Sequence, residues 1–274
     1  MTTNSRRSWK DGGGDLEEFF PHCDPLAPEA AVFSRMIQPH RAACLSLVRL
    51  AALEPLLARG ASREKIFSLF SARELDIFHS YSRFRRKLEW IGGRLAAKTA
   101  LGRIFDDGGG KREEQAGYPE ILPAPDRRPL VILGTMTTAA HVSISHSGDY
   151  AVAMAHHRYS CGVDLQNITS RLKKVVSRFA DEDEIRLLAE HLEPFCGRLQ
   201  RLCLLWSAKE AYKKSLCRDQ PPGFADIRLR RIQAASTLGF RIEYRRDPLS
   251  AADVHVALFQ GYTLAHIVHR SRRA

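Results

Sequence analysis

The chain of 274 residues lacks the patterns that would make it a membrane or secreted protein. It has no uninterrupted apolar run near the ~18 residues that a membrane-spanning helix needs. Residues 1–14 are polar and glycine-rich, without the apolar centre of a secretory signal. We therefore expect a cytoplasmic protein that does not enter a membrane.

Several nucleotide, hydrolase and metal motifs are also missing. The glycines around residues 107–114 do not have GxxxxGK[ST] spacing, no GxGxxG follows a strand, and no GxSxG elbow is present. Six cysteines occur without a CxxC pair, which disfavours a zinc knuckle or a thioredoxin-like site. We expect mostly buried thiols in a reducing compartment.

Positive charge is abundant. The net charge is +11 and the pI about 9.6, so the surface should attract polyanions. Nucleic acid, a phosphate-rich cofactor and an acidic protein all satisfy this condition. One reading is therefore a basic nucleic-acid-binding protein without enzymatic activity, although no helix-turn-helix, zinc-finger or RRM signature stands out.

The first half of the sequence favours helices. Apolar spacing predicts a helix over residues 31–58, after a flexible segment 1–30. Ser71-Ala-Arg-Glu74 resembles a capping box that opens a helix running, with a break, to Leu101. Within it, Arg94 and Lys98 lie four residues apart, and this spacing favours a solvated basic face. Residues 117–135 carry four prolines and are expected to be irregular.

Strands follow. Residues 141–145 and 150–155 flank a Ser-Gly-Asp turn and predict a hairpin, and residues 161–165 predict another strand. Helical periodicity covers residues 172–216, and the end of the chain returns to strands at 226–232, 239–244, 254–259 and 262–268. Helices precede strands in both halves, which predicts an α+β protein and suggests an internal duplication as a hypothesis.

A few polar residues stand out in these elements. Asp164 and Gln166 would share one face of a strand, where a carboxylate either holds a hard cation or caps a turn. Glu210 and Lys214 would be neighbours on a helix, either as an ordinary ion pair or as a carboxylate beside a phosphate-stabilising cation. His146, at a strand end, would either contact a phosphate or bond within a turn.

The order of these motifs is more specific than any one of them. Ile144-Ser-His-Ser147, then Gly162-Val-Asp-Leu165, then Trp206-Ser-Ala-Lys-Glu210 with Lys214, resembles the phosphopantetheinyl transferase superfamily. The length resembles its larger, surfactin-synthetase-activator type. The clear resemblance spans residues 90–214, with a weaker likeness in the final strands.

This resemblance implies a set of site residues. Asp164, Glu210 and Lys214 would be catalytic, and Mg²⁺ or Mn²⁺ would be held by Asp164 and Glu210. Gln166 stands where the family usually has a second acid, and is a further candidate ligand. Residues implied to bind coenzyme A are Arg73, Arg86, Lys87, Tyr118, Pro119, Ser145, His146 and Lys214. Tyr118 replaces a usual basic residue of the family segment Gly117-Tyr-Pro.

The resemblance also implies a reaction and a fold. The 4'-phosphopantetheine arm of coenzyme A would pass to a serine of an acidic apo acyl or peptidyl carrier protein, with release of adenosine 3',5'-bisphosphate. Glu210 would accept the serine proton, Lys214 would stabilise or protonate the leaving phosphate, and His146 would hold the 3'-phosphate. The expected architecture is a monomeric pseudo-dimer of two similar α/β halves, residues 31–157 and 158–274, each with a small antiparallel sheet packed on a long helix.

Overall fold

The computed structural model describes residues 34–40, 43–107, 118–216, 221–234, 238–259 and 261–269. Helices and small antiparallel sheets alternate along this part of the chain, so the expected mixture of helix and antiparallel sheet is confirmed. No helix among the described residues is long and apolar enough to cross a membrane. The expected flexible segment 1–30 lies outside the described residues.

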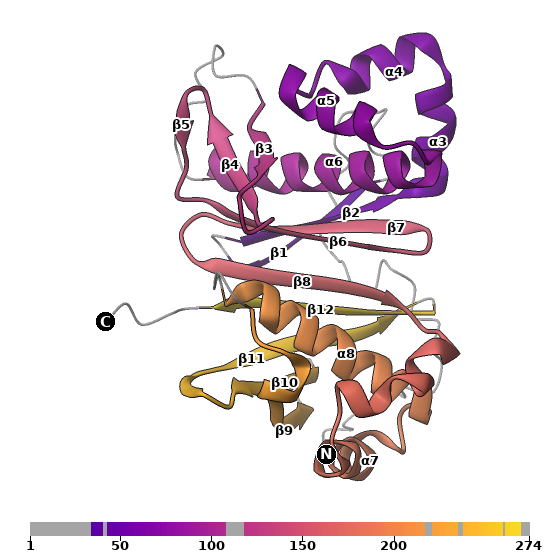
Figure 1. Ribbon diagram of the computed structural model, residues 1–274, viewed down its shortest axis with the longest axis vertical. Coiled ribbons are helices and arrows are strands. Elements are labelled where there is room, and N and C mark those ends of the chain that lie inside the picture. Colours follow the sequence, from indigo (N-terminus) through magenta and orange to yellow (C-terminus); the bar gives the residue numbers. More distant parts are fainter. Residues whose placement is uncertain are drawn as a thin grey trace, which may run out of the picture.

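A four-stranded antiparallel sheet forms the centre of the first half. Its strand order is β1 (Ser34–His40), β2 (Ala43–Arg49), β7 (Tyr150–His156) and β6 (His141–Ser147). Helix α6 (Phe84–Asp107) packs along one face of this sheet, and Figure 1 shows it lying between the sheet and the three shorter helices. Those helices are α3 (Leu50–Ala58), α4 (Gly60–Phe67) and α5 (Ala72–Ser80).

The helix expected over residues 31–58 is wrong for most of its described residues. Residues 34–40 and 43–49 form strands β1 and β2, and only α3 is helical. Strand β2 is buried from Ala43 to Val48, between β1 and β7. A strand that is apolar on both faces has no period-2 alternation, so its pattern does not separate it from a buried helix.

The segment expected to be irregular also contains strands. Residues 120–123 form β3 (Glu120–Pro123), residues 129–133 form β4 (Pro129–Leu133), and residues 136–137 form β5 (Met136–Thr137), in a separate three-stranded sheet. Pro123 and Pro129 are paired at the loop end of the β3–β4 hairpin, as the last residue of one strand and the first of the next, where a missing N–H costs least. The prolines therefore mark the ends of the strands and do not prevent them.

A five-stranded antiparallel sheet forms the second half. Its order is β8 (Ser160–Asn167), β12 (Tyr262–His269), β11 (Asp247–Phe259), β10 (Leu238–Tyr244) and β9 (Ile227–Ala234). The strands expected here are confirmed, with β11 longer than predicted. Helix α8 (Arg198–Ser215) packs on β8, β12 and β11, and α7 (Glu182–Leu192) packs beside β9. The predicted helical stretch from residue 172 begins with short 3₁₀ turns at Ser170–Lys174 and Val176–Arg178.

The two halves meet through their sheets, with α6 and α8 on the outer faces (Figure 1). Apolar side chains of β2 and β7 pack against those of β8 and β12. Along the joint, three serine hydroxyls of β6 accept backbone N–H groups of the edge strand β8. The pairs are Val163 N to Ser143 Oγ at 3.0 Å, Leu165 N to Ser145 Oγ at 3.3 Å and Asn167 N to Ser147 Oγ at 2.9 Å. We call these residues the serine ladder.

A buried glutamate–lysine pair fastens α5 to α6. The predicted capping box is confirmed: Ser71 caps α5, and Glu74 bonds back to the Ser71 N–H. Glu74 Oε2 also accepts a bond of 2.8 Å from Lys98 Nζ, and its Oε1 accepts the Ile121 N–H at 3.1 Å. Lys98 Nζ donates further to Pro119 O at 2.6 Å. The pair therefore holds two helices and the start of β3 together.

The same arrangement recurs in the second half. Asp181 caps α7, and the third residue of that helix, Glu184, is buried. Lys209 Nζ of α8 lies 2.8 Å from Glu184 Oε2 and also donates to Phe179 O at 2.6 Å. Glu184 Oε1 accepts the N–H of Leu229 in β9 at 2.7 Å. Because both ions are buried, each depends on its partner to remain charged.

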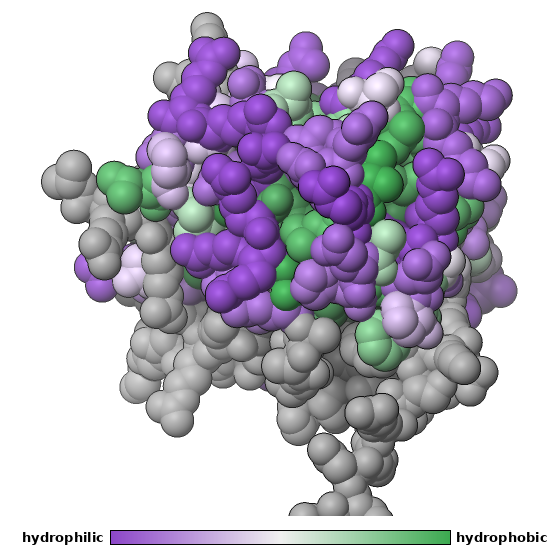
Figure 2. Space-filling model, turned by 90° about the horizontal axis from the view of Figure 1, so that it is seen from below, coloured by the Kyte–Doolittle hydropathy of each residue, from purple (hydrophilic) through white to green (hydrophobic). Residues whose placement is uncertain are grey.

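The surface at the α7–β9 end of the molecule is mainly hydrophilic, with hydrophobic side chains visible between the charged ones (Figure 2). Several of its arginines face carboxylates. Arg228 Nη2 lies 3.4 Å from Asp181 and 3.3 Å from Asp183, and Arg245 Nη2 lies 3.1 Å from Asp181. Part of the positive charge of the chain is therefore used in pairing within the fold.

Candidate active site

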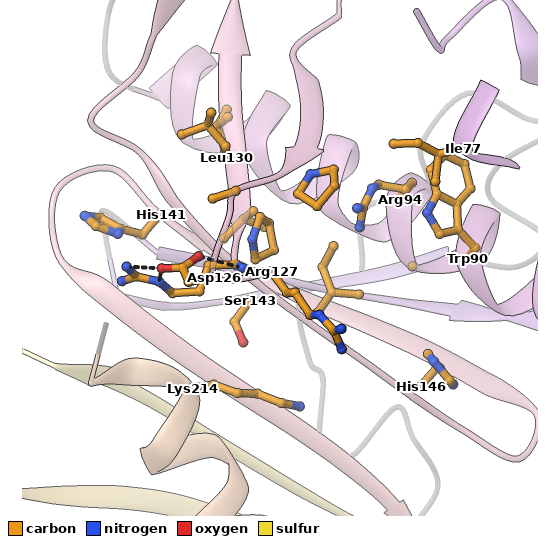
Figure 3. Close-up of a pocket in the computed structure, with 18 of the residues that line it drawn as sticks. Ile77, Trp90, Arg94, Asp126, Arg127, Leu130, His141, Ser143, His146 and Lys214 are labelled. Atoms are coloured by element: carbon orange, nitrogen blue, oxygen red, sulfur yellow. Dashed lines mark hydrogen bonds and ion pairs between the residues drawn. The ribbon is translucent and has the colours of Figure 1, made fainter. Parts of the chain in front are cut away.

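A cavity of about 770 Å³ is lined mainly by the first half, and the second half contributes Cys161 and Lys214. Its lining comes from α6, the β3–β4 hairpin, β6, β8 and α8, and Figure 3 shows Arg94, His146 and Lys214 lying around it on three different elements. The long segment between Pro123 and Ala140 supplies one wall. The chain therefore brings the motifs of β6 and α8 to one place although they are far apart in sequence.

Asp164 is the buried carboxylate of this region. Its Oδ1 accepts hydrogen bonds from Lys214 Nζ at 2.8 Å and from Ser145 Oγ at 3.0 Å. Its Oδ2 is buried and has no hydrogen-bond partner among the described residues. A buried carboxylate oxygen without a partner is costly, so this atom is a candidate to receive a ligand of its own.

Glu210 lies on α8, one turn before Lys214. Burial raises the pKa of Glu210, and the charge of Asp164 raises it further, while Lys214 and Lys213 oppose the shift. Within the part of the chain that the structure describes, the Glu210 carboxylate has no hydrogen bond or ion pair. Two carboxylates and one ammonium thus share a small region, which is the arrangement the sequence motifs suggested.

The close approach of α8 to β8 depends on Gly162. A Cβ at this position would lie 1.8 Å from the backbone oxygen of Ala211. Only glycine allows the helix to approach the strand this closely, and this approach brings Glu210 of the helix near Asp164 of the strand. The glycine of the Gly-Val-Asp motif is therefore explained by packing.

His146 lies at the other side of the cavity, beside α6. Its Nε2 is 3.0 Å from Arg86 Nη1, and its Nδ1 is 3.6 Å from Glu89 Oε2. Burial lowers the pKa of His146; Glu89 opposes this shift, and the positive charges of Arg86, Lys214 and Arg85 add to it. The imidazole is thus held among cations, where an anionic ligand would be attracted.

Other residues predicted to bind the cofactor lie elsewhere. Arg73 forms an ion pair with Glu120, and Lys87 Nζ lies over the Phe78 ring at 5.4 Å from its centroid. Tyr118 is half exposed. These three residues and Pro119, whose carbonyl accepts Lys98, are not among the described residues that line the cavity. Gly117 lies outside the described residues.

Two further predicted residues make local bonds. Ser145 is occupied by Asp164 and by the Leu165 N–H, so its one hydroxyl proton is already donated. The side chain of Gln166 donates from Nε2 to the backbone oxygen of Asn167 at 2.8 Å. The amide oxygen of Gln166 is the group that would have to serve as a metal ligand.

The solvated basic face expected at Arg94 and Lys98 is wrong. Lys98 is 5% exposed and paired with Glu74, while Arg94 lines the cavity with its Nε fully buried. The sequence did carry a signal: Ile91 to Ala97 is apolar around every side of the helix apart from Arg94. A helix that is apolar all round is buried, and its few charged residues are buried with it.

Comparison with known proteins agrees with the motif order. The family model described as the 4'-phosphopantetheinyl transferase superfamily matches residues 160–265, which include Asp164, Glu210 and Lys214. A holo-[acyl-carrier-protein] synthase of Bacillus subtilis is 35% identical over 102 residues, covering 35% of this chain and 81% of the relative. One from a Geobacillus species is 32% identical over 109 residues, covering 40% and 88%.

A solved structure is also similar. The Helicobacter pylori holo-[acyl-carrier-protein] synthase in complex with coenzyme A has 20% identity and a TM-score of 0.32, covering 41% of this chain and 96% of that one. The assignment rests on the sequence relatives, of which this chain spans more than four fifths at over 30% identity. The chain belongs to the 4'-phosphopantetheinyl transferase superfamily.

Proposed function

We propose that this protein transfers the 4'-phosphopantetheine group of coenzyme A to a serine of an apo acyl or peptidyl carrier protein. Adenosine 3',5'-bisphosphate is the other product. The observation that carries the proposal is the meeting of Asp164, Glu210 and Lys214 beside a cation-lined cavity. Relatives of the chain named as holo-[acyl-carrier-protein] synthases support the same reaction.

Each step has a residue suited to it. Glu210 is placed to accept the proton from the carrier serine as its oxygen forms a bond to the pantetheine phosphorus. The bond from that phosphorus to the adenosine bisphosphate oxygen breaks, and Lys214 stabilises or protonates the departing oxygen. His146 and Arg86, on the opposite wall, hold the 3'-phosphate.

A divalent cation fits this site. Among the described residues, neither the buried Oδ2 of Asp164 nor the carboxylate of Glu210 has a partner, and both are hard oxygen ligands of the kind that Mg²⁺ or Mn²⁺ requires. Asp164 and Glu210 would hold the ion, with Gln166 as a further candidate; no group of three or more His, Cys, Asp or Glu side chains suited to a metal occurs among the described residues. When bound, the ion would neutralise negative charge on the pyrophosphate.

Gln166 offers a direct test of this ligand set. In Gln166→Glu a third carboxylate would lie on the same face of β8 as Asp164, so Mg²⁺ should bind more tightly. Calorimetric titration of Mg²⁺ in the presence of coenzyme A measures the change. Unchanged affinity would show that position 166 is not a ligand.

We propose also that the chain is a monomeric pseudo-dimer of the surfactin-synthetase-activator type, with halves 31–157 and 158–274. The strand order supports it: β2-β7-β6 and β8-β12-β11 are both antiparallel, and in each the last strand of the half lies between the strand just before it and an early strand of the same half. The recurring pairs Glu74–Lys98 and Glu184–Lys209 support it further. The matched relatives align with 35% and 40% of this chain, which is close to the extent of one of the two proposed halves.

The carrier proteins of this family are acidic, and the net charge of +11 is complementary to them. The four described cysteines form no disulfide with one another, in keeping with the proposed reducing cytoplasm. The alternative of a nucleic-acid-binding protein has only the net charge as support, and part of that charge faces carboxylates at the α7–β9 end.

The test uses purified protein, coenzyme A, Mg²⁺ and a panel of apo carriers from fatty-acid, polyketide and nonribosomal-peptide systems. Mass spectrometry should detect the added arm on at least one carrier. Glu210→Gln should lower the rate by about 10²–10⁴-fold, the range for loss of a general base. Glu190→Gln on α7 is the matched control. Transfer to none of the carriers would overturn the proposed function.

A further inference from the structure

Tyr262 crosses the joint between the two halves and holds a turn beside the candidate site. It lies on β12 and is 5% exposed, with its ring perpendicular to that of Tyr150 at 5.2 Å between centroids. Its hydroxyl oxygen accepts the backbone N–H of Asp149 at 3.0 Å. Gly148 and Asp149 form the two-residue turn between β6 and β7. A side chain of the second half is therefore bonded to a turn of the first.

Gly148 shows how closely the tyrosine hydroxyl packs against this turn. Its φ of +54° lies in the left-handed region, which favours glycine. A Cβ at this position would also lie 2.3 Å from the hydroxyl oxygen of Tyr262. The missing side chain therefore serves the backbone conformation and leaves room for the hydroxyl.

The first half supports the same turn with its own bonds. Arg85 of α6 donates to the backbone oxygen of Gly148. The N–H of Leu50, at the start of α3, donates to the backbone oxygen of Asp149 at 2.7 Å. These bonds hold the turn against the helices of the first half, and Tyr262 adds a link from the turn to the second half.

His146 precedes this turn by two residues. It lines the cavity, where Figure 3 shows it close to the end of the β6–β7 hairpin. The end of β6 moves with the turn that follows it, so the position of the imidazole in the cavity depends on how firmly the turn is held. Supporting bonds of this kind keep a binding group in its productive geometry.

The strand that carries Tyr262 also adjoins the proposed metal ligands. In the β12–β8 pairing Tyr262 lies opposite Asn167, the residue after Gln166, and Ala265 lies opposite Asp164. Paired strands move together, so the tyrosine hydroxyl has a fixed position relative to the Asp164 backbone. A short series of contacts thus runs from Asp164 through β12 and the turn to His146.

We infer that Tyr262 is a positioning residue that sets the separation between His146 and the carboxylates of the candidate site. The inference rests on the proposed function, in which His146 holds the 3'-phosphate of coenzyme A and Asp164 lies at the pyrophosphate. Tyr262 is not among the described residues that line the cavity, so it acts on the coenzyme through His146.

The first experiment measures coenzyme binding in the presence of Mg²⁺ and without carrier. Tyr262→Phe keeps the ring and removes the hydroxyl, so the Asp149 N–H loses its acceptor. Calorimetric titration should show coenzyme A bound about three- to tenfold more weakly, the effect of one lost hydrogen bond. Dephospho-coenzyme A lacks the 3'-phosphate and should bind as it does to wild type. Equal losses for both coenzymes, or no loss for coenzyme A, would overturn the inference.

A double-mutant cycle with His146→Gln separates positioning from general weakening. If Tyr262 acts through His146, Tyr262→Phe should change coenzyme A affinity by less than about twofold once residue 146 is glutamine. The same loss in both backgrounds would show that the two residues act independently, which also contradicts the inference.

Tyr212→Phe is the matched control for loss of a buried hydroxyl. Tyr212 is fully buried between α8 and β11, where its hydroxyl lies 2.7 Å from Ser250 Oγ. This variant should lower the free energy of unfolding in urea, as Tyr262→Phe does, and leave coenzyme A affinity unchanged. A comparable loss of coenzyme A affinity in Tyr212→Phe would assign both losses to weakened folding and sink the inference.

NMR of the ligand-free protein tests the geometry without any coenzyme. The imidazole signals of His146, assigned through His146→Gln, should shift in Tyr262→Phe and keep their positions in Tyr212→Phe. Unchanged His146 signals in Tyr262→Phe would refute the positioning role. If wild type binds neither coenzyme, the proposed function fails, and these signals still decide whether Tyr262 positions His146.

Discussion

The hydroxyl of Ser145 donates to Asp164 Oδ1 over 3.0 Å while accepting the backbone N–H of Leu165. One side chain therefore joins the two halves and orients the buried carboxylate. Since Oδ1 is occupied in this way, the other oxygen of Asp164 is left for a ligand. Ser145 is thus a positioning residue in the ligand-free protein.

Ser145→Ala should lower stability and metal affinity together. The Leu165 N–H would lose its acceptor, at a cost of about 1–3 kcal/mol, and Asp164 would be less firmly oriented. Urea unfolding and Mg²⁺ titration measure the two effects. Ser147→Ala removes the matching bond to Asn167, and should reduce stability while leaving Mg²⁺ affinity as in wild type. Equal Mg²⁺ affinities in all three proteins would contradict the role given to Ser145.

Gly162→Ala should disturb the approach of α8 to β8. The new Cβ would clash with the backbone of Ala211, and overpacking of this kind costs about 1–3 kcal/mol or more. Glu210 and Lys214 would move with the helix, so transfer activity should fall further than stability predicts. In Gly239→Ala, by contrast, the nearest atom, Gln233 O, would lie at 4.0 Å. If both variants remain fully active, the spacing of helix and strand is not critical.

The two buried lysines should be equivalent in their effect on stability. Lys98→Met and Lys209→Met each leave a buried glutamate without its partner, which costs about 3–5 kcal/mol. Adding Glu184→Gln to Lys209→Met should recover part of the loss, because the amide stays neutral and still accepts the Leu229 N–H. Urea unfolding measures each variant, and Lys173→Met, at an exposed position, is the control. A large cost in one half only would count against the pseudo-dimer.

His146 should make the ligand-free protein less stable in mild acid. Its folded-state pKa lies below the unfolded value, so between the two the unfolded chain binds a proton that the folded chain does not. Stability should therefore fall as pH drops through and below about 6.5. His146→Gln should lose less stability than wild type between about pH 7.5 and 5.5. His157→Gln, at an exposed position, is the control, and parallel wild-type and His146→Gln profiles would refute the prediction.

Local patterns were predictable where neighbouring residues decide the structure. The capping box at Ser71, the hairpin around Gly148 and the C-terminal strands all follow from short-range chemistry. The helix expected over residues 31–58 failed because β2 is buried on both faces, which removes the alternation that marks a strand.

Some residues of the candidate site could likewise be predicted from the sequence, and others could not. Asp164, Glu210, Lys214 and His146 were found through an ordered set of motifs. The burial of Arg94 was missed because its four-residue spacing from Lys98 was given more weight than the apolar run around it, and because the β3–β4 hairpin that lines the same cavity comes later in the chain. The pairing of Arg73 with Glu120 joins residues 47 positions apart, and no local pattern indicates it.

The serine ladder also has a consequence for the isolated halves. Strand β8 satisfies its outward N–H groups with side-chain oxygens of β6, not with a neighbouring backbone. Expressed alone, the C-terminal half would present three unsatisfied donors along an open sheet edge, which is a template for pairing with another chain. Division of this protein at the joint should therefore yield fragments that self-associate, and mixing them should favour recovery of the intact pair.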